Sequence, residues 1–303
     1  MNSTLGAHRQ MKLNSNPPWL SKKLISTGRA IRVKEILSEL GVRTVCESGA
    51  CPNLNECYSK GRATFLILGN TCTRNCAFCL VNKGYPEKPE QDEPYRTAET
   101  VRRLGLEYVI ITSVTRDDLN DGGAGQYIKT IESIRALSEN VRIEILVPDF
   151  CGMEASIGRV LKACPDVFSH NVETAEWLYP KIRSGADYRL SLSILKNAKR
   201  LFPSQITKSG IMAGLGETDA DIYKTIEDIR ETGCDILTIG QYLRPSEGNL
   251  PVNRYVDEDT FRRYREFGEK IGFRHVASGS FVRSSYFAED NYNQMKGKKY
   301  DRG

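Results

Sequence analysis

The chain has 303 residues, 40% apolar and 27% charged, and its 43 basic and 38 acidic side chains give a net charge of +5. This composition is typical of a soluble globular protein, and a chain of this length buries roughly 75% of its unfolded surface without disulfides. The small net charge does not favour a nucleic-acid partner, and no apolar run approaches the ~18 residues that a membrane span needs. We therefore expect one large domain with appendages, and neither a nucleic-acid nor a membrane partner.

The N-terminal leader is basic, because seven Lys or Arg residues precede the first acidic residue, Glu35. An acid-poor, Ser-containing leader is compatible with an organellar transit peptide. Pro17 and Pro18 interrupt any amphipathic helix early, so we favour a cytoplasmic protein without a targeting leader. An odd count of nine cysteines also speaks against a secreted disulfide framework.

Short β-rich segments alternate with amphipathic helical segments along most of the chain. A helix is expected over 31–40, followed by a cysteine-rich loop over 46–61. The predicted strands are 64–68, 108–112, 142–147, 167–171, 206–213 and 236–239. The helical segments between and after them are 98–104, 127–137, 154–163, 191–201, 220–231 and 260–271.

Six strand and helix units in alternation predict an α/β fold with a parallel sheet, because each parallel strand needs a crossover connection. We expect a partial (β/α)6 TIM-like barrel, with a doubly wound open sheet as the alternative. The expected division is an N-terminal extension over 1–62, the barrel over 63–272 and a C-terminal extension over 273–303. In either fold the chemistry belongs at the C-terminal ends of the strands.

The most specific motif is a C-x3-C-x2-C loop formed by Cys72, Cys76 and Cys79, directly after the first predicted strand. Three thiolates cannot complete a structural zinc site, which takes four ligands, and no His lies nearby. They can hold three irons of a [4Fe–4S] cluster and leave the fourth iron open. A zinc site completed by a distant ligand is the alternative.

A second triplet, Cys46, Cys51 and Cys57, has C-x4-C-x5-C spacing and again lacks a nearby fourth cysteine. By the same argument this triplet is a second iron–sulfur site that needs one unconventional ligand. The alternative is a cluster of reduced structural cysteines, although free thiols rarely gather without a metal or redox role.

The sequence resembles the lipoyl synthase family of the radical S-adenosylmethionine (SAM) superfamily over nearly its whole length. The stretch CESGACPNLNECYSKGRATFLILGNTCTRNCAFC at 46–79 looks like the double-cluster signature of that family. The C-x3-C-x2-C loop indicates only the superfamily, whereas the second triplet together with Arg283-Ser284-Ser285-Tyr286 is specific to the family. Further matching stretches are PWL at 18–20, ITSVTRDDL at 111–119, DGGA at 121–124, HNVET at 170–174, KSGIMAGLGET at 208–218, IGQYLRPS at 239–246 and LPVNRYV at 250–256.

The resemblance implies a sulfurtransferase that inserts sulfur at C6 and C8 of an octanoyl group linked to a carrier-domain lysine. It implies two [4Fe–4S] clusters and SAM as cofactors, with the auxiliary cluster as sulfur donor. The implied partners are an octanoylated lipoyl carrier domain (a dehydrogenase E2 subunit or the glycine cleavage H protein), flavodoxin or ferredoxin as reductant, and an Fe–S assembly carrier. Unactivated C–H bonds resist acid–base attack, so the cofactor must carry the reaction while the protein orients it.

The resemblance also assigns residues. Ser285 is the expected fourth ligand of the auxiliary cluster and a catalytic residue, because a hard oxygen ligand detaches from iron more readily than a thiolate. Ser284 is the alternative ligand, and strand-like geometry would point the two serines oppositely. SAM contacts are expected from Gly122, Gly123, Asn171, Glu173 and Arg183, although a simple turn, a buried pair or a helix cap are the competing interpretations.

Three substitutions depart from the family pattern: Tyr58 replaces a usual Trp, and Arg244 and Asn249 stand where Gln and His are common. They leave the cluster ligands intact and bear on substrate contacts. Among the remaining candidates, His170 and His275 are expected to be core histidines. Cys151, Cys164 and Cys234 are expected to be small buried residues.

Three other functions compete with this interpretation. Another radical SAM sulfur-inserting enzyme, a methylthiotransferase or a biotin synthase-like enzyme, is disfavoured by the RSSY stretch and by the order of the two triplets. A ferredoxin-type electron carrier would hold each cluster with four cysteines. A zinc-stabilised nucleic-acid binder would need a clustered basic helix.

Overall fold

The computed structural model describes residues 17, 20 and 27–297. The expectations for the basic leader and for the last six residues lie outside these residues. Within the described part of the chain, no helix is long and apolar enough to cross a membrane.

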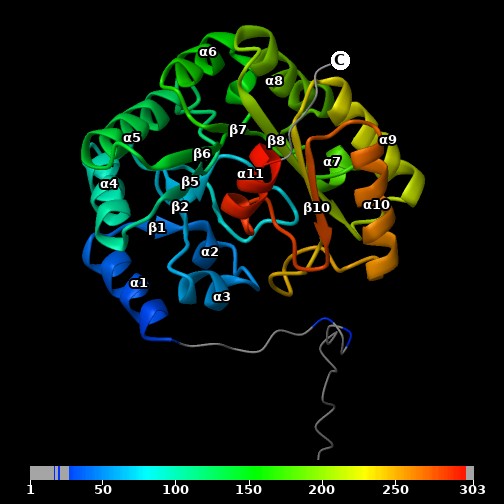
Figure 1. The fold of residues 1–303 in the computed structure, drawn as a ribbon, viewed down its shortest axis with the longest axis horizontal. Helices are drawn as coiled ribbons and strands as arrows, with labels where there is room; N and C mark the ends of the chain where they lie inside the picture. The colour runs from blue at the N-terminus through cyan, green and yellow to red at the C-terminus, as the bar shows by residue number, and fades with distance from the viewer. Residues whose placement is uncertain (1–16, 18–19, 21–26, 298–303) are drawn as a thin grey trace, which may run out of the picture.

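An eight-stranded sheet forms the centre of the molecule, and its strands curve into a partial barrel (Figure 1). Seven neighbouring strands are parallel, and β1 pairs antiparallel with β2 at one edge. In spatial order the strands are β1 (Arg43–Thr44), β2 (Thr64–Ile67), β5 (Tyr108–Ser113), β6 (Arg142–Leu146), β7 (Val167–Ser169), β8 (Ile206–Ala213), β9 (Ile236–Gln241) and β10 (His275–Gly279).

Helices cover the outer face of the sheet (Figure 1). They are α1 (Gly28–Glu39), α4 (Glu93–Leu104), α5 (Ala124–Leu137), α6 (Glu154–Lys162), α8 (Tyr188–Leu201), α9 (Asp219–Glu231) and α10 (Glu258–Lys270). Local sequence sets their ends: Thr218 and Asp221 form a capping box at the start of α9, and Gly105 ends α4 in the left-handed conformation.

Most strands of the sheet are rich in apolar residues because both of their faces are covered. Phe65 and Ile67 in β2 are fully buried, and so are Ile143 and Ile145 in β6. Adjacent residues of a strand point to opposite faces, so a strand buried at every position lies between the outer helices and a filled interior. This confirms the predicted parallel α/β fold.

All six predicted strands are present, and the structure adds two edge strands. β10 lies in the stretch expected to be a C-terminal extension, and it pairs with β9 from His275 opposite Ile236 to Gly279 opposite Gly240. Its sequence, HVASG, lacks the apolar run that predicted the other strands, so pairing with β9 rather than local propensity makes it a strand.

The stretch 46–61, expected to be a loop, contains two short helices, so that expectation was wrong. They are α2 (Val45–Ser48) and α3 (Leu54–Ser59). Helices of four and six residues are too short to show a periodic apolar pattern, and tertiary packing stabilises them.

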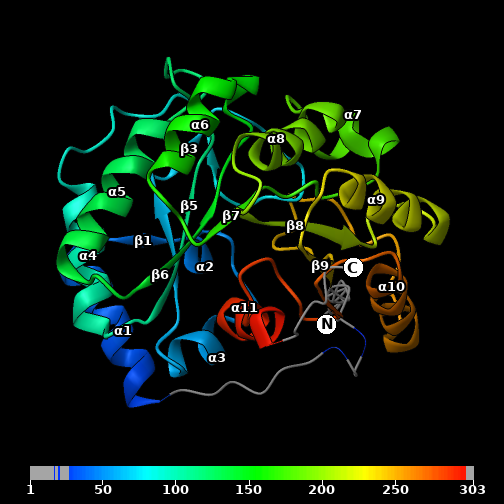
Figure 2. The same ribbon diagram turned by 45° about the horizontal axis from the view of Figure 1, so that its top comes forward.

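Helix α11 (Ala288–Gly297) closes the N-terminal end of the barrel. Its Tyr292 and Met295 pack against Val167, Ile206 and Ile236, the first residues of β7, β8 and β9. Figure 2 shows α11 beside α3 at the end of the barrel opposite α7 (Tyr179–Ile182). The C-terminal segment therefore returns to the stretch that carries Cys46, Cys51 and Cys57.

Candidate active site

The C-x3-C-x2-C cysteines meet at the C-terminal end of the barrel. Cys72, Cys76 and Cys79 line a cavity of about 200 Å³ that also includes Thr112 of β5 and Leu146 of β6. The loop starts and ends in a small two-stranded sheet of β3 (Thr71–Cys72) and β4 (Asn82–Lys83). The cysteines therefore lie where a parallel barrel presents its reactive groups.

Backbone groups of Thr115 and Ile182 and the side chain of Asn249 hold the cysteine loop. The Cys72 Sγ accepts hydrogen bonds from the N–H groups of Arg74 and Thr115, at 3.4 and 3.3 Å. The Ala77 N–H donates to the carbonyl of Ile182 in α7 at 2.9 Å. Asn249 donates from its side-chain amide to the carbonyls of Ala77 and Cys79, at 3.1 and 3.0 Å. Asn249, one of the three departures from the family pattern, thus positions the loop.

Arg74 fastens the same loop to two strand ends. Its guanidinium donates to both carboxylate oxygens of Asp149, at 2.5 and 2.7 Å, and to those of Asp117, at 2.9 and 2.8 Å. Asp149 follows β6 and is 1% exposed. Burial raises the pKa of Asp149, but the Arg74 charge outweighs it and holds that pKa below its usual range.

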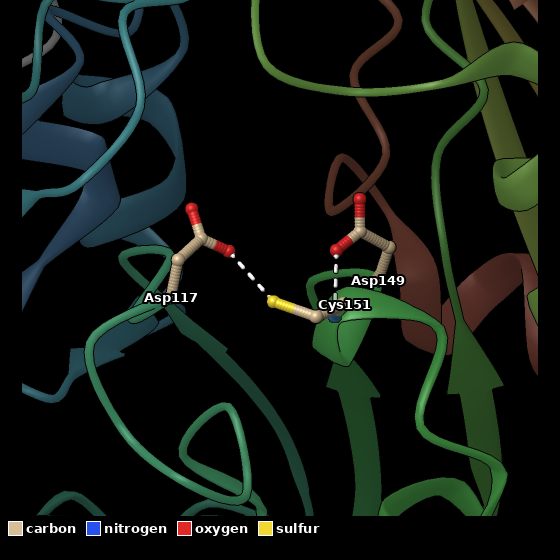
Figure 3. A group of neighbouring side chains, drawn as sticks. All are labelled: Asp117, Asp149 and Cys151. Atoms are coloured by element: carbon tan, nitrogen blue, oxygen red, sulfur yellow. Dashed lines mark hydrogen bonds between the residues drawn. The ribbon is translucent and has the colours of Figure 1, made fainter.

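Cys151 lies beside these two carboxylates, as Figure 3 shows. Among the described residues, Asp117, Asp149 and Cys151 are the group of acidic and sulfur side chains compact enough for one metal ion. Arg74 already supplies the positive charge there, and the Cys151 thiol donates to Asp117 at 3.1 Å. Partial burial and that hydrogen bond raise the Cys151 pKa to about 11, and the three side chains form a hydrogen-bonded network whose negative charge Arg74 compensates.

The electrostatics of this cavity disfavour free thiolates and favour thiolates that bind a cation. Burial raises the pKa of Cys76 to about 11 against the opposing charge of Arg183, and burial also raises the pKa of Cys79. Neighbouring cysteines raise both values further. Three crowded thiols become thiolates readily only when iron supplies compensating charge, so this donor set fits an iron–sulfur cluster.

Asn171, Glu173 and Arg183 line this cavity as well, so the structure brings them together with the three cysteines. Asn171 donates from its side-chain amide to the Glu173 carboxylate at 3.1 Å, and Arg183 donates to the Asn171 carbonyl at 3.0 Å. Burial raises the pKa of Glu173, whose φ of 73° lies in the strained left-handed region. An acid, an amide and a cation thus lie beside the cluster loop.

Gly122 and Gly123 do not line this cavity in the structure. Both have positive φ at the start of α5, where a Cβ would lie 3.0 Å from Phe150 Cα and 2.4 Å from Leu68 Cδ1, respectively. Close packing and the helix start account for both glycines, which matches the simple-turn interpretation.

The second cysteine triplet lies on the two short helices. Cys46 is in α2, Cys57 is in α3, and the Cys51 N–H between them donates to the Cys46 carbonyl at 3.0 Å. Tyr58, in place of the usual Trp, is fully buried and shares a hydrogen bond of 2.8 Å with Thr44. That contact fixes α3 against the segment before α2.

Burial and the charge of Cys51 raise the pKa of Cys46 to about 12. Arg283, whose charge interacts with Cys51, lines the same cavity as Cys46, Cys51, Cys57 and Ser285, and Lys60 and Arg62 line it as well. Two sulfur triplets of similar electrostatic character therefore stand in one molecule, and each fits an iron–sulfur cluster with one open position.

Ser285 lines the cavities of the second triplet, whereas Ser284 does not. The Ser284 hydroxyl instead donates to Asn171 Oδ1 at 3.1 Å. The expected strand-like geometry was wrong, because both serines lie in a turn between β10 and α11. The turn still separates the two hydroxyls: Ser285 lies toward the second triplet, and Ser284 lies toward the cavity of Cys72, Cys76 and Cys79.

A cavity of about 410 Å³ connects the two triplets. Cys46, Cys51 and Ser285 line it from one side and Cys79 from the other, with Met212, Gln241 and Arg244 from the ends of β8 and β9 and the loop after β9. We call it the mouth cavity. It is the space in which a group could contact both triplets.

The remaining cysteines and histidines divide between surface and core. Cys234 is fully buried as expected, but Cys151 and Cys164 are exposed, so that expectation was wrong for both. Cys151 lies in the short 3-10 helix Phe150–Gly152 and Cys164 follows the end of α6, and each has positive φ, so tertiary position rather than residue type decides their exposure. His170 and His275 are buried, and they bond the Val147 carbonyl at 2.9 Å and Asn291 Oδ1 at 3.1 Å.

Solved structures share this fold. HydG, a maturase of the [FeFe]-hydrogenase, matches 82% of this chain and 62% of its own with a TM-score of 0.55 and 15% identity. Coproporphyrinogen III oxidase from Escherichia coli, a radical SAM enzyme, matches 68% of this chain and 52% of its own with a TM-score of 0.52 and 14% identity. At these identities the likeness concerns the fold alone.

Residues 66–229 match the Radical SAM superfamily, which together with the barrel and its three-cysteine loop defines the class of protein. Two curated relatives identify the family within this class. The lipoyl synthase of Caldanaerobacter subterraneus subsp. tengcongensis is 50% identical over 93% of this chain and 98% of its own. That of Verminephrobacter eiseniae is 53% identical over 90% of this chain and 83% of its own. The chain belongs to the lipoyl synthase family, as its sequence motifs predict.

Family membership makes the chain a radical SAM sulfurtransferase with two [4Fe–4S] clusters and SAM as cofactors. The octanoylated carrier is the substrate class that membership implies. Sequence reasoning missed Arg74 and Asn249 as positioning residues. Their signal was only their place, inside the cysteine loop and at a departure from the family pattern.

Proposed function

We propose that this chain inserts sulfur at C6 and C8 of an octanoyl group carried on a lysine of a lipoyl carrier domain. The observation that carries the proposal is the mouth cavity, which Cys79 lines from one triplet and Cys46, Cys51 and Ser285 from the other. When bound, SAM and the cluster on Cys72, Cys76 and Cys79 supply a radical, and the auxiliary cluster supplies sulfur.

The protein's own residues bind and orient in this proposal. Cys72, Cys76 and Cys79 hold the first cluster, and Asn171, Glu173 and Arg183 bind the amino and carboxylate groups of SAM. A buried acid suits an ammonium, and a guanidinium suits a carboxylate. The expected contacts of Gly122 and Gly123 with SAM stay a prediction.

Cys46, Cys51, Cys57 and Ser285 hold the auxiliary cluster. Ser285 supports this role because it lines both cavities of that triplet. A hydroxyl oxygen suits a cluster iron less well than a thiolate does, so Ser285 would be the most labile ligand of the four. Helices α2 and α3 and the turn that carries Ser285 then act together on the auxiliary side of the barrel.

The mouth cavity also suggests how the acyl chain is held. Phe78, Met212 and Tyr242 line it with apolar surface, and Arg244 lies at its border. Arg244 donates to the Asn249 carbonyl at 2.8 Å, so it ties the cavity border to the residue that holds the cysteine loop. An apolar cavity of this kind suits an octanoyl chain and excludes water from a radical.

We further propose a cytoplasmic enzyme whose carrier is a dehydrogenase E2 subunit or the glycine cleavage H protein. Flavodoxin or ferredoxin would supply electrons, and an Fe–S assembly carrier would refill the auxiliary site. These partners follow from the family and from the need for a reductant and a cluster source.

The test is anaerobic incubation with SAM, reductant and an octanoylated lysine peptide, followed by mass spectrometry. The expected product gains the mass of two sulfur atoms, and the protein carries about eight irons per chain. A methylthio product, or one sulfur that bridges two carbons, would instead favour another radical SAM sulfur-inserting enzyme. The control is a Cys46→Ala variant, which should cleave SAM without transferring sulfur.

A further inference from the structure

The auxiliary cysteines Cys46 and Cys51 line two neighbouring cavities. The mouth cavity contains Met212 and Gln241 from the C-terminal ends of β8 and β9. A second hollow of about 40 Å³ contains Thr64 and Tyr108, the first residues of β2 and β5. We call this hollow the basal cavity, since strands that run parallel place their first residues at the same end.

The second cysteine triplet forms the partition between these cavities. Cys46, Cys51 and Ser285 line both of them, whereas Cys57 lines only the basal cavity. Neither Cys72, Cys76 nor Cys79 lines the basal cavity. The auxiliary thiols are therefore accessible from a side that does not pass the SAM site.

Charged side chains surround the basal cavity and join two distant segments. Arg62 donates to Glu289 Oε2 at 2.8 Å and to Asp290 Oδ2 at 2.9 Å. The Lys60 ammonium lies 4.2 Å from the centre of the Phe287 ring, and Tyr286 donates to Glu56 at 3.0 Å. We call these contacts between α3 with its following residues and the start of α11 the basal latch.

The ion pairs of the basal latch contribute little to stability. Side-chain exposure is 33% for Arg62, 30% for Glu289 and 44% for Asp290, and partly exposed ion pairs contribute little because water screens them. Phe287 has a φ of 51°, a strained value for a bulky residue. Ser285 lies only four residues before Glu289, so displacement of the latch also displaces a proposed cluster ligand.

We propose that the basal cavity is the route by which iron and sulfide, free or presented by a carrier protein, reach Cys46, Cys51 and Cys57, and that the basal latch controls this access. The inference rests on the proposed function, in which the auxiliary cluster is consumed and must be replaced. Replacement from the base leaves the mouth cavity to SAM and the acyl chain.

The test uses the full chain with Cys72, Cys76 and Cys79 changed to Ala, so that only the auxiliary site takes up iron. Iron uptake is measured anaerobically from ferrous iron with sulfide, and in a separate arm from an Fe–S carrier protein. Iron loss to a chelator is measured after loading. Adding Arg62→Gln should raise the rates of uptake and loss about threefold, in keeping with the small contribution of exposed ion pairs.

Arg103→Gln is the matched control, because Arg103 has the same 33% side-chain exposure as Arg62 and pairs with Glu39 and Glu99 away from both cavities. Arg62→Lys should restore the slow rates, and Glu289→Gln provides a second way to open the latch if Arg62→Gln does not fold. Met212→Trp, which fills the mouth cavity, should leave uptake unchanged.

Faster uptake in either arm supports the route, and the arm that responds identifies whether free ions or a carrier uses it. Rates equal to those of the Arg103→Gln control in both arms would overturn the proposal, as would slower uptake in the Met212→Trp variant. Neither measurement requires SAM or an octanoyl substrate. A failure here is therefore distinguishable from a failure of sulfur insertion.

Discussion

Ser284 donates a hydrogen bond of 3.1 Å to Asn171 across 113 residues of sequence. Asn171 lines the cavity of the C-x3-C-x2-C cysteines, and the neighbouring Ser285 lines the cavities of the other triplet. One dipeptide at the C-terminal turn therefore contacts both halves of the active site.

Substitutions of the two serines should have different effects on the reaction. Ser285→Ala is expected to keep SAM cleavage but to stop sulfur insertion, because the proposed labile ligand is lost. Ser284→Ala removes one hydrogen bond of about 1 kcal/mol, so SAM binding should weaken roughly fivefold while sulfur insertion continues. Product mass spectra and 5′-deoxyadenosine yields measure both. Dithiolated product from Ser285→Ala at the unmodified rate would show that the fourth iron is held elsewhere.

Cys72→Ala, Cys76→Ala and Cys79→Ala should each abolish SAM cleavage while the auxiliary cluster remains. Each change removes one of three thiolates from a site with no spare ligand. Iron content and 5′-deoxyadenosine formation are the measurements. Continued cleavage in all three variants would contradict the assignment.

We expect that lysine cannot replace Arg74, whose guanidinium donates paired hydrogen bonds to Asp117 and Asp149. Arg74→Lys keeps the charge but cannot donate in parallel pairs to both Asp117 and Asp149. It should shift the spectrum of the reduced SAM-bound cluster and slow SAM cleavage more than tenfold, with iron content unchanged. Cys151→Ala, which removes one exposed hydrogen bond in the same network, is the control and should keep the spectrum.

Cys234 should matter for stability and the two exposed cysteines should not. Cys234→Ala removes a fully buried side chain and is expected to cost about 1 to 3 kcal/mol of unfolding free energy. Cys151→Ala together with Cys164→Ala should cost less than about 0.5 kcal/mol. Urea denaturation compares them, and unchanged iron content would confirm that none of the three is a ligand.

His170 predicts a pH dependence of stability in the iron-free protein. Burial and the Arg183 charge lower its pKa to about 4, below the ordinary value of about 6.5, and its Nδ1–H donates to Val147. Because the unfolded chain binds the proton more tightly, this stability is full above pH 6.5 and is lost as the pH falls toward 4. The loss should reach about 2 to 3 kcal/mol. The His170→Asn variant keeps a hydrogen-bond donor toward Val147. Its denaturation midpoint, measured across this pH range, should not show the loss of stability at low pH.

The cysteine spacings and the apolar strand runs predicted the cluster loop and the parallel sheet, and the resemblance of both triplets and of RSSY to family motifs indicated the family. The physical basis of the first two predictions is local, because ligand number follows from spacing and a strand covered on both faces is rich in apolar residues. The helices at 188–201 and 219–231 were found for the same reason, because their apolar faces are periodic.

Only the tertiary structure decided how distant segments meet. β10 is a strand because β9 offers it a partner, and Cys151 is exposed although its residue type favours burial. The Arg74 fork, the turn that separates Ser284 from Ser285 and the basal latch each join residues far apart in sequence. Such contacts depend on the packed positions of several elements at once, and no local pattern encodes them.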